Sequence, residues 1–381
     1  VFVTLSWSAL CDPLAGWIYQ TELVQNLLPR SYFLYGTIGA MFLFILSFCK
    51  PFAGEYLWLY LLGTAMLFRF AYSLIDVPHN SLLGRVQEQG QSVAKLGAMR
   101  LGATIAGTLA VIGAAQFAIS GAAWHFAAFA IAAGIAGAIL FIRFFPFSTL
   151  PSSQATANHA KFVPPATTSK ALTASAALFI SAISATVVNG MFSKDIVYIA
   201  KYVLSDPAWT ITGLTLFTAG KIAGVPCWVW FSEQKGIVGT MRASFLLIAV
   251  VGAGVALTPP AFYYLGTALF FFGIGIAGTN IAGWALMPDC ADLFPPNDHP
   301  LFFGLFTAAN KVASGLSGAI VGYTLAQLGI AGGSSSSESQ ARGLYWLVYI
   351  YPIAGAVLGI GGIAMYRFLR SSRFERPRFN V

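Results

Sequence analysis

The chain has 381 residues, of which 57% are hydrophobic and only 9% are charged. A soluble domain carries about 25% charged residues, so this composition excludes a water-soluble globule and predicts a polytopic membrane protein. The net charge of +8 does not indicate nucleic-acid binding, because most of the excess lies in short loops and in the tail, where it sets membrane orientation. The His and Cys residues form no catalytic grouping or metal-binding spacing, so we expect neither an enzyme nor a bound metal or cofactor.

Apolar stretches long enough to cross a bilayer follow one another along the chain. A helical span needs about 20 apolar residues. The sequence therefore predicts an all-α protein of about eleven spans, which are 1–18, 32–50, 54–83, 94–118, 122–145, 169–203, 208–231, 238–257, 260–288, 300–328 and 343–368. The Pro-, Ser- and Thr-rich stretch 146–168 predicts a cytoplasmic linker between an amino-terminal bundle, 1–145, and a carboxy-terminal bundle, 169–381, which ends in a basic tail.

Lys and Arg residues in the loops indicate the orientation. With the loop 19–31 placed inside, thirteen basic residues fall on the cytoplasmic side and two or three on the other side, which is the bias expected of cytoplasmic loops. We therefore expect a multi-pass integral membrane protein with a cytoplasmic carboxy terminus. Eleven spans then put the amino terminus outside, and one further helix before residue 1 would restore twelve spans and place both ends inside.

Charged side chains lie inside several of these spans. A charge at bilayer depth costs about 2.5–3.5 kcal/mol, so such residues normally face a water-filled cavity or one another and mark a transport path. The acids are Asp12 and Asp76, and the bases are Arg69, Arg100, Lys194, Lys201, Lys221 and Lys311. Lys194 is followed directly by Asp195, and we interpret these two side chains as a local ion pair.

The two acids have polar neighbours at helical spacing. Ser8 lies four residues before Asp12, and Tyr72 lies four residues before Asp76, so each pair shares one helix face. Pro78 removes a backbone donor and frees a carbonyl nearby, which suits a polar cavity.

Segments in five of these spans resemble a known family in order and approximate spacing. The matching positions are Asp12 in Asp12-Pro13-Leu14-Ala15-Gly16-Trp17, Asp76 before Pro78, Arg100, the pair Asp289 and Asp292, and Lys311 followed by small residues. They look like the glycoside–pentoside–hexuronide:cation symporters of the major facilitator superfamily, the melibiose-carrier type. The resemblance implies the two-bundle fold of that superfamily, with the first of twelve helices missing from this chain, in the inner membrane of a bacterium.

The resemblance also implies a secondary active transporter that moves a sugar or sugar-acid solute together with a cation by alternating access. It implies a cation-coupling role for Asp12 and Asp76, with Ser8 and Lys311 beside them. Because Ser8 stands where sodium-using members carry a second Asp, we expect protons rather than sodium as the coupling ion.

Further candidate positions are polar or aromatic side chains on or near the same spans. We expect the substrate to contact Arg100, Tyr72, Asn80, Thr307, Lys311, Lys221 and Trp284. We expect Asp289, Asp292 and Arg30 to act as gate or loop-anchoring residues. The interior holds more bases than acids, which favours an anionic solute such as a uronate or an acidic glycoside. We expect a monomer whose partners are this solute and the lipid bilayer.

Two alternatives stay open. The many Phe residues and the long spans are compatible with a carrier of lysolipids or of another amphipathic anion, and a lateral cleft between helices lined by Phe would favour it. A non-transporting membrane sensor is the second alternative, against which the lack of a soluble signalling domain in this sequence argues.

Overall fold

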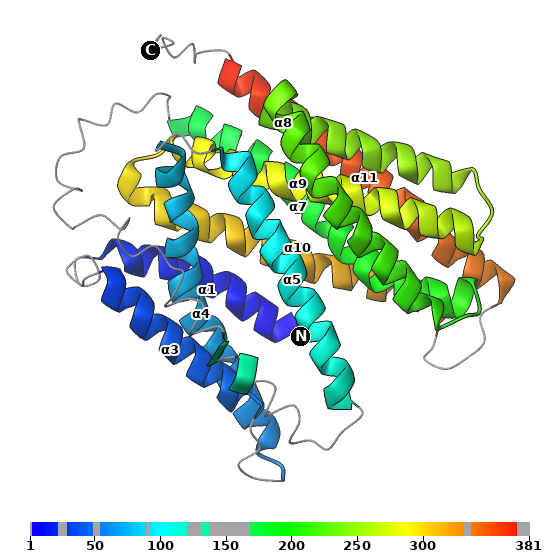
Figure 1. The fold of residues 1–381 in the computed structure, drawn as a ribbon, viewed down its shortest axis with the longest axis horizontal. Coiled ribbons are helices and arrows are strands. Elements are labelled where there is room, and N and C mark those ends of the chain that lie inside the picture. Colours follow the sequence, from blue (N-terminus) through cyan, green and yellow to red (C-terminus); the bar gives the residue numbers. More distant parts are fainter. Residues whose placement is uncertain are drawn as a thin grey trace. The chain divides into compact units, whose positions relative to one another are not determined.

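A computed structural model gives the structure of residues 2–21, 29–48, 54–88, 92–119, 131–133, 135–136, 168–330 and 337–371. The predicted span 122–145 and the predicted linker 146–168 lie almost entirely outside these described residues. Every regular element in the described part is a helix, as Figure 1 shows.

Long apolar helices make up most of the described chain. They are α1 (Phe2–Gln20), α3 (Pro29–Leu46), α4 (Leu57–Glu88), α5 (Val93–Ile119), α7 (Thr168–Tyr198), α8 (Trp209–Ala256), α9 (Phe262–Ala291), α10 (His299–Gln327) and α11 (Glu338–Ser371). A π-helix, Ile199–Val203, continues α7, and a 3-10 turn, Pro296–Asp298, precedes α10. Among the described residues, five helices are long and apolar enough to cross a membrane. The predicted all-α membrane class is confirmed, while the number of spans stays a prediction.

Helix α8 joins two spans that the sequence predicts separately, 208–231 and 238–257. It runs for 48 residues, and its helical geometry is interrupted at Gly236, where φ is 72° and ψ is 168°. Glycine adopts this positive φ without the steric penalty that other residues meet. Figure 1 shows α8 as two arms that meet at a bend, so the element contains two helical spans with a glycine between them.

The chain packs as two compact units. The first comprises Val1–Arg85, Ala106–Pro165 and Ala291–Val312, and the second comprises Val86–Ile105, Ala166–Cys290 and Ala313–Val381. These units do not follow the predicted linker, because part of α5 is grouped with later helices and part of α10 with earlier ones. The predicted division at 146–168 stays a prediction.

Side chains from neighbouring helices interlock within each unit. In the first unit, Phe33 and Ala40 of α3 are buried with Ile75 of α4. In the second unit, the beginning of α5 packs on α8 and α9, where Leu101 and Trp228 share a cluster of buried side chains with neighbouring α9 residues. Helix α11 packs against α7 and α8. Dispersion contacts of this kind replace the hydrophobic effect as the force between helices in a membrane.

Candidate functional site

An acid and a lysine meet inside the first unit. Lys311 Nζ of α10 donates a hydrogen bond to Asp12 Oδ1 of α1 over 2.6 Å, and Ser73 Oγ of α4 donates to the same oxygen over 2.6 Å. The Asp12 side chain is fully buried and that of Lys311 is 19% exposed. Three helices therefore contribute to one charged cluster, and the predicted proximity of Asp12 and Lys311 is present.

Two glycines bring α1 and α10 close enough for this contact. A Cβ atom at Gly304 would lie 2.5 Å from the carbonyl oxygen of Asp12, and one at Gly16 would lie 2.6 Å from the carbonyl oxygen of Pro300. Real Cβ atoms do not approach other atoms so closely, so both positions require glycine for the two backbones to pack at this distance. Lys311 lies seven residues after Gly304, on the same face of α10.

The second oxygen of the Asp12 carboxylate is also buried. Among the described residues, Asp12 Oδ2 has no hydrogen-bond partner, and the same is true of Ser8 Oγ one turn earlier in α1. A buried oxygen that lacks a donor is energetically costly, and it can be satisfied by a proton or by a small cation. The coupling roles of Ser8 and Asp12 stay predictions.

Asp76 contacts a different residue from those of the Asp12 cluster. Its carboxylate Oδ1 lies 3.5 Å from Tyr72 Oη, which is a long and weak hydrogen bond. Within the described part of the chain, Asp76 makes no salt bridge. Asn80, one turn further along α4, is fully buried. The hydroxyl of Thr307 donates to its own helix, at the carbonyl oxygens of Phe303 and Gly304. The roles proposed for these positions stay predictions.

Three of the predicted substrate contacts lie in the second unit. The guanidinium carbon of Arg100 in α5 lies 3.7 Å from the centre of a Trp284 ring in α9, which is a cation–π arrangement. Lys221 Nζ of α8 donates to Asn189 Oδ1 of α7 over 2.9 Å. Arg100 and Trp284 are thus in contact, Lys221 has a separate partner, and their roles as substrate contacts stay predictions.

The predicted gate residues divide among different settings. Asp289 Oδ2 accepts a hydrogen bond of 2.7 Å from Arg370 Nη1, which ties the end of α9 to the end of α11. Asp292 is half-buried in the turn after α9. Arg30 belongs to the first turn of α3, but its side chain lies outside the described residues. The anchoring half of the prediction agrees with the Asp289 contact, and no gating motion follows from it.

Sequence reasoning missed three partners of the predicted residues. Ser73, Asn189 and Arg370 each hydrogen-bond to a charged candidate. Ser73 and Asn189 are small polar residues inside apolar spans, and that signal was available in the sequence. Arg370 is one of the thirteen basic residues that the sequence analysis assigns to the cytoplasmic side, and it lies in the last turn of α11. Which candidate each one meets depends on packing between helices distant in sequence.

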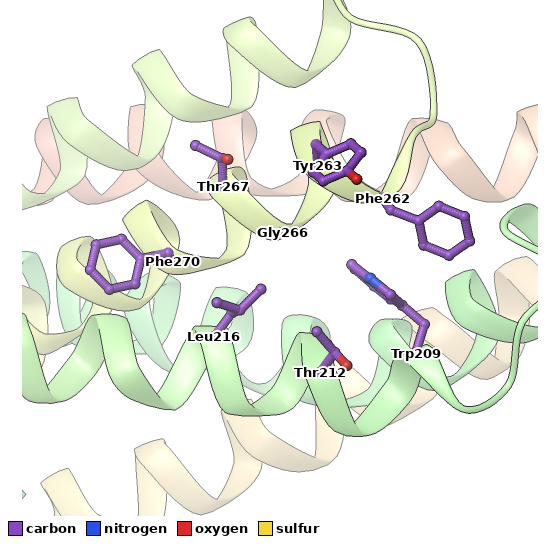
Figure 2. Close-up of a pocket in the computed structure, with 8 residues that line it drawn as sticks. All are labelled: Trp209, Thr212, Leu216, Phe262, Tyr263, Gly266, Thr267 and Phe270. Carbon is purple, nitrogen blue, oxygen red and sulfur yellow. The ribbon is translucent and has the colours of Figure 1, made fainter.

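A pocket opens between α8 and α9 in the second unit. Figure 2 shows it lined by Trp209, Thr212, Leu216, Phe262, Tyr263, Gly266, Thr267 and Phe270. Its volume is ≈ 540 Å³. Phe262 and Tyr263 are largely exposed, so the pocket is an open, aromatic groove on the helix pair. The sequence predicted none of these residues as site residues.

A set of long apolar helices that buries an acid–lysine pair is characteristic of a membrane transporter. A family model described as "MFS/sugar transport protein" matches residues 1–373. The chain belongs to this family of major facilitator superfamily transporters, which handle small-molecule solutes and span the membrane several times. The melibiose-carrier type that the motifs resemble is a narrower grouping than this match defines.

Curated relatives match parts of the chain. A stretch of 227 residues is 29% identical to the "Putative 2,3-dihydroxypropane-1-sulfonate exporter" of Escherichia coli strain K12 and covers 54% of this chain and 46% of that protein. Another stretch of 124 residues is 27% identical to the "Putative sulfoquinovose importer" of the same strain and covers 29% of this chain and 26% of that protein. The chain thus spans about half the length, or less, of these two relatives.

Solved structures share the fold. A bacterial homologue of the iron transporter ferroportin in an outward-facing state has a TM-score of 0.65 at 12% identity, covering 97% of this chain and 89% of that one. The fucose:proton symporter of E. coli has a TM-score of 0.60 at 12% identity, covering 97% of both chains. These likenesses show the major facilitator fold that the sequence predicts.

Proposed function

We propose that the protein is a proton-coupled symporter of an anionic, sugar-derived solute. The observation that carries the coupling step is the Asp12 carboxylate, which is buried on α1 with one oxygen bonded to Lys311 and Ser73 and the other without a partner among the described residues. Protonation of Asp12 would release the Lys311 ammonium, and deprotonation would recapture it. A proton and a charge-sensitive conformational step are linked in this way.

The solute is anionic in this proposal because bases outnumber acids inside the spans. Arg100, Lys221 and Lys311 are the bases that we assign to its recognition, with Trp284 stacked on Arg100. The two relatives described above are named for sulfonated solutes, which supports a negatively charged group on a small polyol or sugar. Their names also point in opposite directions, so the direction of transport is left to experiment.

The narrower assignments follow the same reasoning. We propose a monomer of the melibiose-carrier type in a bacterial inner membrane, with its carboxy terminus in the cytoplasm. The ordered matches from Asp12 to Lys311 support the type, and the loop bias of Lys and Arg supports the orientation.

The test is transport by the full chain in proteoliposomes. Two matched pairs of probes isolate the charge, namely glucuronate with glucose, and 2,3-dihydroxypropane-1-sulfonate with glycerol. We expect an imposed pH gradient, without sodium, to drive accumulation of the anion in at least one pair and of neither neutral probe. Counterflow from both sides reports direction. Transport of neutral sugars alone, unaffected by Arg100→Ala, would contradict the proposal.

A second candidate function is a carrier of lysolipids or another amphipathic anion. The aromatic groove between α8 and α9 favours it, because Phe262, Phe270 and Trp209 form an apolar wall on the outside of a helix pair (Figure 2). Transfer of a fluorescent lysolipid between vesicle leaflets, which Phe270→Ala would slow, tests it. If the wild-type protein transfers lysolipid no faster than protein-free vesicles do, this candidate is rejected.

A further inference from the structure

Two lysines of the second unit lie beside consecutive residues of α7. Lys221 Nζ donates to Asn189 Oδ1 over 2.9 Å and lies 4.2 Å from the centre of the Phe217 ring. Lys194 Nζ donates to Ser317 Oγ of α10 over 2.6 Å. A Cβ atom at Gly190 would lie 3.6 Å from the same nitrogen. Asn189 and Gly190 are consecutive, so the two ammonium groups lie beside neighbouring positions of α7.

Small residues surround the Lys194 ammonium. The carbonyl oxygen of Ser314 lies 3.3 Å from its ammonium nitrogen, and a Cβ atom at Gly318 would lie 3.7 Å away. The partners of Lys194 on α10 are thus a hydroxyl, a carbonyl and a bare backbone. All of these are neutral.

Neither lysine forms a salt bridge in the described part of the chain, although Asp195 interacts electrostatically with Lys194. The described residues hold four salt bridges, and neither Lys194 nor Lys221 takes part in one. Asp195 follows Lys194 directly, but its side chain is 2% exposed and one of its oxygens has no hydrogen-bond partner among the described residues. Lys194 therefore interacts electrostatically with Asp195 without a salt bridge, while its hydrogen bonds go to Ser314 and Ser317 of α10.

Two half-buried ammonium groups on membrane-spanning helices carry a cost that hydrogen bonds to neutral acceptors offset only in part. An anion bound beside them would lower that cost, because it adds the attraction of opposite charges to the hydrogen bond. Lys is a compact point charge with three donors, which suits a sulfonate or carboxylate group presented from any angle.

We propose that Lys194 and Lys221 bind the acidic group of the transported solute at the Asn189–Gly190 turn of α7. The inference rests on the proposed function and deepens it, because it assigns the anion to the second unit and adds Lys194 to the recognition residues. A sulfonate or carboxylate on a small polyol is the ligand class. Arg100 and Lys311 then act elsewhere on the solute or on coupling.

The test is equilibrium binding to the purified full chain in detergent micelles, with 2,3-dihydroxypropane-1-sulfonate and glucuronate as probes and glycerol and glucose as neutral controls. We expect Lys194→Gln and Lys221→Gln each to weaken binding of the bound anion by about tenfold or more, since each removes one charge-assisted bond. Lys194→Arg and Lys221→Arg keep the charge and should retain most of the affinity. Lys235→Gln is the control, because Lys235 is an exposed lysine of α8 and should bind as wild type does.

The outcomes separate the two proposals. If wild type binds an anion and both Gln variants bind it equally well, the lysine site is wrong while the anion carrier stands. If wild type binds neither anion, or binds a neutral probe equally well, the proposed substrate class fails and this site fails with it. Thermal unfolding without ligand shows whether each variant is folded. The anion should then raise the unfolding temperature of wild type and of the Arg variants but not of the Gln variants.

Discussion

Lys311 Nζ lies 2.6 Å from Asp12 Oδ1, and these two residues are 299 positions apart in the chain. The pair joins α1 to α10 inside the first unit, and Ser73 of α4 completes it. Because Asp12 has no exposed surface, removing either charge would leave the other without its partner in a buried site. Substitutions at this pair therefore test both helix packing and the proposed coupling.

Asp12→Asn should abolish accumulation driven by a pH gradient. The amide is close to the carboxylate in size, but it cannot take up a proton, so downhill counterflow should survive while concentrative transport is lost. Transport in proteoliposomes with and without the gradient measures both. Asp298→Asn is the matched control, since Asp298 is an exposed acid just before α10. Gradient-driven accumulation by Asp12→Asn at the wild-type level would rule out Asp12 as the coupling acid.

The charges of Asp12 and Lys311 should stabilise each other, so that the losses of stability in the two single variants are not additive. Lys311→Met leaves a buried carboxylate without its counter-charge and should cost about 3–5 kcal/mol of stability, as breaking a buried pair does. The double variant Asp12→Asn with Lys311→Met removes both charges and should recover much of that loss. Chemical unfolding of the four proteins in detergent gives the coupling energy, and strictly additive losses would mean that the two side chains do not interact.

The sequence predicted the charged residues better than their partners. Asp12 and Lys311 could be found because an acid or a lysine inside an apolar span is rare and costly. The hydrogen-bond partner of Lys194 was not predicted, because Lys194 donates to Ser317 on α10 while its interaction with the adjacent Asp195 is electrostatic only. The bend in α8 was expected as a loop between two spans, and Gly236 provides it within one element. Which helices meet depends on packing that one sequence does not reveal.

Gly304→Ala should separate α1 from α10. The added Cβ atom would lie 2.5 Å from the carbonyl oxygen of Asp12, so the backbones must move apart at a cost of about 1–3 kcal/mol. The movement should also weaken the bond between Asp12 and Lys311, and coupling should fall with stability. Gly322→Ala in the same helix is the control, because nothing lies within 4 Å of its Cβ position. Unfolding in detergent compares the two, and equal stability would contradict close packing at Gly304.

Arg370→Gln should loosen the end of α11. Arg370 Nη1 donates to Asp289 Oδ2 over 2.7 Å and to Tyr366 Oη over 3.1 Å, and both charged side chains are about one third exposed or less. Loss of a hydrogen bond between charged groups costs about 1.5–3 kcal/mol. Arg342→Gln is the control, since its bond to Glu338 lies in the open and surface pairs contribute little. Equal unfolding temperatures for the two variants would show that the Asp289 contact does not anchor the helix.

Arg100→Lys should reveal whether the flat guanidinium matters beyond its charge. Arg100 lies 3.7 Å from the centre of a Trp284 ring, and a guanidinium stacks on an aromatic ring in a way that a lysine ammonium does not reproduce. The stacking is worth about 0.5–2 kcal/mol, so anion affinity should fall by about twofold to thirtyfold. Trp284→Phe weakens the same contact from the other side and should give a loss in the same range, with the double variant no worse than the larger single loss. Affinity titrations of the three proteins decide the matter. A full additive loss in the double variant would mean that Arg100 and Trp284 act on the solute independently, and that the ring does not orient the guanidinium.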